Sequence, residues 1–124
     1  MISVIIPTLN EEDNIASVIQ FAVSQPFVTE VIVVDDKSQD KTVPIALSNK
    51  AKVITSTKLG KGASMKDGVL CAKNDILVFL DGDIDPYPHF TIKLLTDPIL
   101  QGEVDFVKSS FSRNAGRVTE LAAK

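Results

Sequence analysis

Three aspartates stand within five positions of the stretch DILVFLDGDID, at Asp81, Asp83 and Asp85. Residues 76–80, which precede them, form a continuous apolar run that predicts a buried strand. Carboxylates this close together repel one another, and a carboxylate buried without a partner is strongly disfavoured. The end of this strand is therefore expected to meet a cation.

The D-x-D pattern at a strand end predicts a metal site of a particular kind. Asp81 and Asp83 are separated by Gly82, so that both carboxylates can turn toward one point. Oxygen ligands suit Mg²⁺ or Mn²⁺, which keep several waters and also bind substrate phosphates. A metal held by Asp83 and Asp81 would stabilise a diphosphate as a leaving group. A solvated acidic turn accounts for D-x-D, taken alone, equally well.

Strand-like and helical patterns alternate along the chain. Apolar runs predict strands at residues 2–7, 31–34, 53–54, 76–80 and 104–107. Helical patterns predict helices from Asn10, from Ser38 or Asp40, around residues 65–72 and at 88–96. Buried strands that alternate with helices are typical of an α/β fold, with a mostly parallel sheet and helices on both of its faces.

Three of these helices carry detailed expectations. The acids at residues 11–13 are expected in the first turn of the first helix, where the positive end of the helix dipole favours them. Met65, Val69 and Ala72 are expected on one face of the third helix. The fourth helix is expected to stop before Pro98, because proline has no N–H to donate.

Polar residues follow four of the predicted strands. They are residues 8–11, the pair Asp35 and Asp36, residues 81–85, and Lys108. Ligands of parallel α/β sheets bind beyond the carboxyl ends of the strands. These residues are therefore expected to gather at one edge of the sheet and to form one site.

Motif spacing and charge exclude several classes of ligand. The first turn, PTLNEE, lacks the glycines of a dinucleotide fingerprint, and the order KGAS at residues 61–64 does not match a Walker loop. In DGDIDPYPHFTI, Pro86 and Ile92 stand where an EF-hand needs glycine and glutamate. A net charge of −3 argues against a general nucleic-acid-binding protein.

The 124 residues suffice for one domain with one core. Cys71 is the single cysteine and cannot form an internal disulfide, which favours a reducing, cytoplasmic location. The N-terminal MISVIIPTLNEE has neither the basic region of a signal peptide nor the length of a membrane span. The oligomeric state is not decided by the sequence, and a homodimer is one alternative.

Four motifs, in this order, together resemble the GT-A glycosyltransferases of the family 2 type. They are PTLNEED after the first strand, VVDDKSQDKT after the second, GKG before the third helix and FLDGDID after the fourth strand. The resemblance covers residues 2–111. It implies a Rossmann-like GT-A domain over residues 1–111 that binds a nucleotide sugar.

The resemblance implies a role for each matched residue around the donor nucleotide. Asp36 would meet the uracil or guanine edge, and Lys61 would lie near the base and diphosphate. Asp81, followed by Gly82, would contact the ribose and the metal, with Asp83 as the direct metal ligand. The loop that cradles the nucleoside would consist of Pro7, Thr8, Leu9, Asn10 and Glu11. Lys37 stands where the family usually has glycine, which leaves the local turn open, and no residue is singled out as catalytic.

The tail FVKSSFSRNAGRVTELAAK and the stretch DGDIDPYP are similar, more narrowly, to glucosyl-3-phosphoglycerate synthases. The similarity implies that Gly116, Arg117, Val118 and Thr119 hold the phosphate and carboxylate of 3-phosphoglycerate. An arginine fork, a threonine hydroxyl and the N–H groups of a helix N-terminus suit such an anion. A capped helix start without a ligand is the alternative. Residues 112–124 would then begin an acceptor-binding segment, and the C-terminal part of the enzyme is expected to be missing.

The implied function is transfer of a hexose to 3-phosphoglycerate with the help of Mg²⁺ or Mn²⁺. UDP-glucose is the first choice of donor and GDP-mannose the second. One alternative is a transferase of the same fold that acts on a lipid phosphate, such as dolichyl or polyprenyl phosphate. The other is a response-regulator receiver, a phosphoacceptor switch that would use Asp35, Asp36, Asp81 and Lys108. In a receiver, however, the strand at 2–7 would be surplus.

Overall fold

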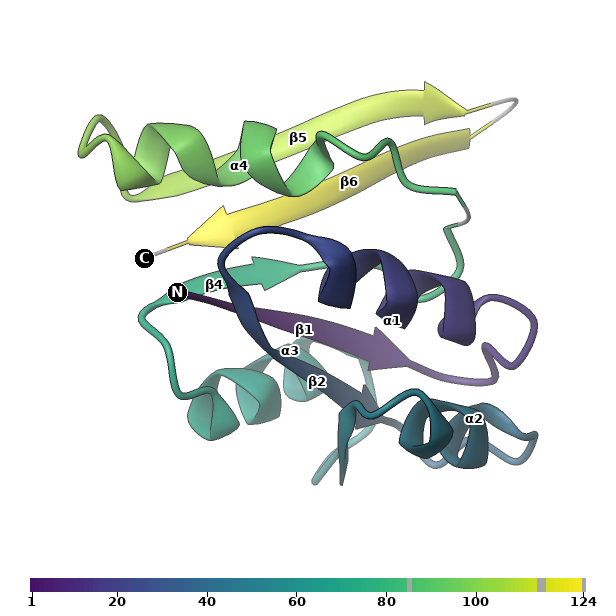
Figure 1. The fold of residues 1–124 in the computed structure, drawn as a ribbon. Helices are drawn as coiled ribbons and strands as arrows, with labels where there is room; N and C mark the ends of the chain where they lie inside the picture. Colours follow the sequence, from purple (N-terminus) through teal and green to yellow (C-terminus); the bar gives the residue numbers. More distant parts are fainter. Residues whose placement is uncertain (85, 114–115, 124) are drawn as a thin grey trace.

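The structure is a computed structural model that describes residues 1–84, 86–113 and 116–123, with the backbone alone for residues 109–113 and 116–122. Strands and helices alternate as far as the fourth helix (Figure 1), which confirms the α/β class. In chain order the elements are β1 (Ile2–Thr8), α1 (Ile15–Ser24), β2 (Val28–Asp35), α2 (Thr42–Ser48), β3 (Lys52–Thr55), α3 (Lys61–Cys71), β4 (Ile76–Phe79), α4 (Thr91–Leu100), β5 (Phe106–Arg113) and β6 (Gly116–Ala123).

The strands form one sheet in the order β3-β2-β1-β4-β6-β5. The first four are parallel, and β1 lies between β2 and β4. Thr8 pairs with Asp35 at the last position of both strands, so that the chains leave the sheet side by side. β6 runs antiparallel to β4 and to β5, which gives the antiparallel part of the mostly parallel sheet.

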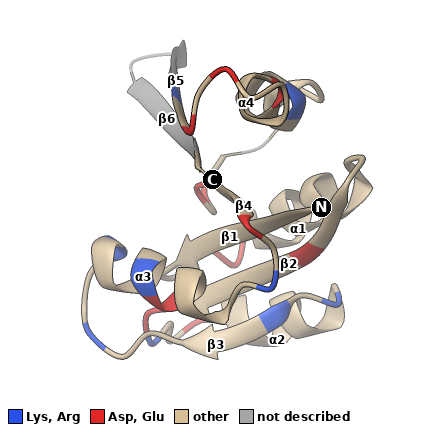
Figure 2. Ribbon diagram, turned by 90° about the vertical axis from the view of Figure 1, so that its left-hand side faces the viewer, with Lys and Arg blue, Asp and Glu red and all other residues tan. Residues whose placement is uncertain are grey.

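Both faces of the parallel strands are covered, as the continuous apolar runs predicted. One cluster, which includes Val4 and Ile6 of β1, packs against α1, α2 and α4. Ile5, between them in sequence, points to the other face and joins Ile32 and Val34 beneath α3. Figure 2 shows α3 on one side of these strands and α1 and α2 on the other. β1 therefore buries side chains on both faces, which explains why its sequence is a continuous apolar run.

The first helix begins later than predicted. It starts at Ile15, and the acids at residues 11–13 lie in the turn before it. Asn10 has a φ of +54°, which no helix contains. Polar groups of residues 10–12 bond the loop after β2 instead of starting a helix, as the site below describes. The prediction that Asn10 starts the helix is therefore wrong.

The third and fourth helices also differ from the prediction. The buried residues of α3 are Ser64 and Gly68, whereas Val69 is 42% exposed, so the face that contains Val69 is not the one that packs on the sheet. Helix α4 continues through Pro98 to Leu100. Burial of Ile99 favours this extension, and the N–H that proline lacks would have bonded Leu94, whose side chain is exposed.

The end of the chain forms a β-hairpin, which the sequence did not predict. Lys108 lies inside β5, opposite Leu121, and not beyond the carboxyl end of a strand. Residues 116–119 lie in β6, so the predicted helix N-terminus at Gly116 is also wrong. The hairpin reaches the parallel part of the sheet only through β6, next to β4 (Figure 1). Among the described residues, no helix is both long and apolar enough to cross a membrane.

Gly68 sets how closely α3 packs on β1, and its replacement tests this packing. A Cβ at Gly68 would lie 2.4 Å from Cγ2 of Ile5 and 3.3 Å from Cγ2 of Val34. We expect Gly68→Ala to lower the free energy of unfolding by about 1–3 kcal/mol, because overpacking outweighs the gain in helix propensity. Urea denaturation measures the change.

Gly62 supplies a matched control in the same helix. A Cβ at Gly62 meets nothing within 4 Å, so that Gly62→Ala should leave stability unchanged or raise it by up to about 1 kcal/mol. Equal stability of the two variants would contradict the close packing at Gly68.

Candidate functional site

A cavity of about 350 Å³ lies beyond the carboxyl ends of β1, β2 and β4. It collects nearly all of the residues predicted to bind a donor nucleotide and metal. Its wall consists of Pro7, Thr8, Leu9, Glu11, Asp36, Gly60, Lys61, Ser64, Asp81, Gly82 and Asp83. Asn10 is the one predicted donor residue outside this wall. The parallel pairing of the strands therefore gathers the polar loops as the sequence predicted.

The two neighbouring aspartates after β2 have different surroundings. Asp35 is buried, and its carboxylate accepts hydrogen bonds from the N–H and the hydroxyl of Ser38, at 2.9 and 2.6 Å. Asp36 lines the cavity, and its Oδ2 accepts the N–H of Gly60 at 3.0 Å. Its Oδ1 is buried and has no hydrogen-bond partner among the described residues. Asp35 thus builds the turn, while Asp36 keeps an acceptor for something else.

Lys37 occupies the turn position at which the resembling family carries glycine. Its φ is +60°, in the left-handed region that glycine enters without a steric penalty. An L-residue there costs about 1 kcal/mol. The two Ser38 bonds to Asp35 hold the turn in this conformation, so the departure at Lys37 leaves the turn intact.

The loops after β1 and β2 are braced against each other by pairs of reciprocal hydrogen bonds. The Asn10 N–H donates to the hydroxyl of Ser38 at 2.8 Å, and Oδ1 of Asn10 accepts the N–H of Gln39 at 2.9 Å. Glu12 and the segment at 40–41 exchange a second pair. Asn10 therefore shapes the cavity from outside, which explains its absence from the wall.

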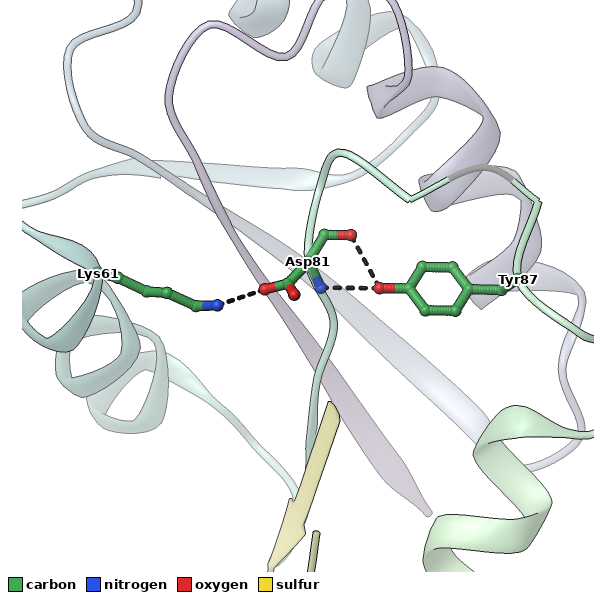
Figure 3. Close-up of polar contacts among 3 residues, drawn as sticks. All are labelled: Lys61, Asp81 and Tyr87. Carbon is green, nitrogen blue, oxygen red and sulfur yellow. Dashed lines mark hydrogen bonds and ion pairs between the residues drawn. The ribbon is translucent and has the colours of Figure 1, made fainter. Parts of the chain in front are cut away.

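Asp81, two residues beyond the end of β4, is held from two sides (Figure 3). Its backbone N–H donates to the hydroxyl of Tyr87 at 2.9 Å, and this hydroxyl donates to the Asp81 carbonyl at 3.0 Å. On the other side, Nζ of Lys61 reaches from α3 to Oδ1 of Asp81 and forms an ion pair with it. Tyr87 is buried and stacks on Phe21, with ring centroids 5.3 Å apart. The loop is therefore tied to the core, and its carboxylate faces the cavity.

Gly82 allows this loop to approach the loop after β1. A Cβ at this position would lie 3.1 Å from Cγ2 of Thr8 and 3.4 Å from Cγ of Glu11. A side chain here would therefore crowd Thr8, and either the Thr8 side chain or the D-x-D loop would have to shift by a few tenths of an ångström. The glycine between the two aspartates thus keeps three carboxylates on one cavity.

The site carries more negative charge than it neutralises. The pKa of Glu11 is raised by burial, and further by the charges of Asp83, Asp40 and Asp81. Lys61 is the cation that faces these groups from α3, and its side chain is 59% exposed. In the described part of the chain, no three His, Cys, Asp or Glu side chains could hold a metal ion by themselves. A divalent cation would fit here if phosphate oxygens and water completed its ligands.

Three contributors to the site were missed by the sequence analysis. Tyr87 bonds the D-x-D backbone, and Gly60 and Ser64 line the cavity. GKG at residues 60–62 was a usable signal for Gly60, but a tyrosine six residues beyond Asp81 carries none. Asp85 and the side chains of the predicted acceptor residues lie outside the described part of the structure.

The raised pKa of Glu11 predicts how pH affects the metal-free chain. Its pKa is higher in the folded than in the unfolded chain, so folding is disfavoured once Glu11 is ionised. We therefore expect Glu11→Gln to unfold at higher urea concentration than the parent at pH 7 with chelator present. The difference should disappear below the pKa of an unfolded glutamate, about 4.3.

Urea denaturation at pH 7 and at pH 4 measures both effects. Glu103→Gln, at an exposed position after α4, is the matched control and should change little at either pH. If Glu11→Gln were less stable than the parent at pH 7, the predicted cost of ionising Glu11 in the folded chain would be disproved.

The chain is similar to known proteins in sequence and in fold. The family model described as glycosyl transferase family 2 matches residues 3–122. Glucosyl-3-phosphoglycerate synthase of Mycobacterium tuberculosis is 35% identical over 99% of this chain and 46% of the relative. The enzyme of that name from Petrotoga mobilis is 32% identical, with the same shares covered. The chain thus spans about half the length of these curated relatives.

A solved structure gives the same result for the fold. It is the Mycobacterium tuberculosis glucosyl-3-phosphoglycerate synthase in complex with Mn²⁺, UDP-glucose and phosphoglyceric acid. The match has a TM-score of 0.84 and 33% sequence identity, and it covers 93% of this chain and 45% of that one. The sheet and its helices are those of the predicted GT-A fold. The chain therefore belongs to glycosyltransferase family 2.

Proposed function

We propose that the chain is the donor-binding part of a glycosyltransferase that moves glucose from UDP-glucose to 3-phosphoglycerate. The observation that carries the donor assignment concerns Asp36, which lines the cavity. Its Oδ1 is buried and has no hydrogen-bond partner within the described part of the chain. A buried acceptor without a partner is costly, and an N–H donor on a ligand would remove that cost. After a small rotation of the carboxylate that keeps the bond between Oδ2 and the Gly60 N–H, the N3–H of uracil supplies such a donor.

Guanine also offers N–H donors, so that the cavity by itself admits GDP-mannose as well. The related structure that contains UDP-glucose favours the uridine nucleotide. The walls at Pro7, Thr8 and Leu9 would flank the nucleoside in either case.

Asp83 and Asp81 would hold Mg²⁺ or Mn²⁺ together with the diphosphate of the donor. The metal, when bound, supplies positive charge where the leaving diphosphate gains negative charge. Lys61 is placed to transfer its ion pair from Asp81 to a phosphate oxygen, because its long side chain is largely exposed. Glu11 would then face a cation in place of bare carboxylates.

The acceptor assignment rests on the tail motif and on the relatives. Solved structures of the Mycobacterium tuberculosis synthase contain phosphoglyceric acid. Gly116, Arg117, Val118 and Thr119 match the segment that holds this acceptor in the resembling enzymes. Because these residues lie in a strand, the anion would be bound by side chains and not by a helix N-terminus. With its single cysteine, the protein is proposed to act in the cytoplasm.

The donor assignment predicts different effects for two aspartates. Asp83→Ala should weaken UDP binding when Mn²⁺ is present and leave it unchanged with chelator. Asp36→Ala should lower the affinity for UDP about tenfold or more, with or without metal, because a hydrogen bond to a charged acceptor is lost. Inorganic pyrophosphate should bind Asp36→Ala as well as it binds the parent.

Calorimetric titration of the 124-residue chain with UDP, GDP and pyrophosphate distinguishes these cases. Asp75→Ala, at an exposed position near the amino end of β4, is the matched control. Tighter binding of GDP than of UDP would overturn the uridine assignment. Equal binding of UDP–Mn²⁺ by Asp83→Ala and the parent would overturn the metal assignment.

The acceptor assignment predicts that phosphate is essential for binding. The chain saturated with UDP and Mn²⁺ should bind 3-phosphoglycerate much more tightly than glycerate. Arg117→Ala should lower the affinity for 3-phosphoglycerate about tenfold or more, since a bidentate contact is lost. The affinity for UDP should stay unchanged. Lys93→Ala, on α4, serves as a control for the loss of positive charge. Preference for a short prenyl phosphate over 3-phosphoglycerate would favour the lipid-phosphate alternative.

A further inference from the structure

Asp67 is an acidic residue of α3 that lies outside the cavity wall and binds the loop at residues 56–60. Its Oδ2 accepts the backbone N–H of Thr57 at 2.7 Å. Its two oxygens also lie 3.0 and 3.1 Å from the hydroxyl of Thr57. The Thr57 N–H bond is the largest of several influences on Asp67, and it holds the pKa of this carboxyl below its usual range.

The loop that Asp67 binds has few other attachments. Residues 57–60 are exposed, and Leu59 is 83% exposed. At the start of the loop, the Ser56 N–H donates to the Asp35 carbonyl at 2.8 Å, and the Ser56 hydroxyl donates to the Lys58 carbonyl at 2.6 Å. At its end, the Gly60 N–H donates to Oδ2 of Asp36. Apolar packing does not fix this loop, so the Asp67 contacts carry much of its order.

The loop in turn orients the carboxylate proposed to recognise the base. Because Gly60 occupies Oδ2 of Asp36, the second oxygen, Oδ1, is the one left for a ligand. If the loop shifted, Asp36 could rotate and present either oxygen. Lys61 would be less affected, since α3 is anchored on β1 through Gly68.

We propose that Asp67 is a positioning residue for base recognition: it holds loop 56–60 so that Gly60 fixes the orientation of Asp36. This proposal rests on the donor assignment made above. It implies that loss of Asp67 impairs recognition of the base but not of the diphosphate. A purely structural role would impair both.

The test compares UDP with inorganic pyrophosphate in the 124-residue chain by calorimetry, each with Mn²⁺. Asp67→Ala should lower the affinity for UDP about three- to tenfold, as expected for the loss of one oriented hydrogen bond. The affinity for pyrophosphate should change less than about twofold. Asp67→Asn, which keeps an oxygen for the Thr57 N–H, should restore most of the UDP affinity. Asp75→Ala is the control for the loss of one negative charge.

A double-mutant cycle gives the decisive result. In the Asp36→Ala background, adding Asp67→Ala should weaken UDP binding by less than about twofold. The carboxylate that Asp67 is proposed to orient is already absent there. Additive losses, equal losses for UDP and pyrophosphate, or no loss for UDP would each overturn the proposal. If Asp67→Ala does not fold, Thr57→Val, which removes the hydroxyl contact at an exposed position, must show the same selective loss.

The proposed function and the role of Asp67 fail in different ways. A parent chain that binds UDP no more tightly than pyrophosphate would refute base recognition itself. A parent that prefers UDP, combined with an Asp67→Ala chain of unchanged preference, would refute only the role of Asp67.

Discussion

The parallel pairing of β1 with a strand on each side is the constraint on which the site depends. β1 pairs with β2 on one side and with β4 on the other, and the chain reverses its direction of winding between them. Loops that leave neighbouring strands at such a point diverge and leave a crevice. The crevice receives a turn from β1, an aspartate pair from β2 and the D-x-D loop from β4. Moving any one strand in the order would separate these groups.

Electrostatics and packing act against each other at this edge. The loops carry several carboxylates, and repulsion among them would drive the loops apart. Gly82 nevertheless lets the D-x-D loop approach Glu11, and Tyr87 ties that loop to the core. Lys61 offsets part of the charge, yet the raised pKa of Glu11 indicates that compensation is incomplete. Apolar burial of the strands therefore holds together an edge that its own charges disfavour, and this is the condition under which a cation binds well.

The sequence predicted the features that depend on strand burial and missed those that depend on contacts distant in the chain. β1, β2 and β4 were found because apolar runs buried on both faces leave little ambiguity. The start of α1 was misplaced because Asn10 is bonded by Ser38, which lies 28 residues away. The buried face of α3 was not identified because the close approach at Gly68 selects small residues and not apolar ones. Tyr87 could not have been identified without knowing that its ring lies beneath the D-x-D loop.

Two unfavourable features at this edge are of kinds that a ligand would relieve. Glu11 has a raised pKa, and Asp36 has a buried oxygen without a hydrogen-bond partner among the described residues. Glu30 also has such an oxygen among the described residues, but its other oxygen accepts two hydrogen bonds, and the residue does not line the cavity. At Asp36 and Glu11 the stabilising partners, an N–H donor and a cation, are of the kinds that a nucleotide–metal complex supplies. Folding thus leaves unsatisfied at this edge the interactions that binding completes, and ligand affinity and the stability of the free chain are expected to change in opposite directions there.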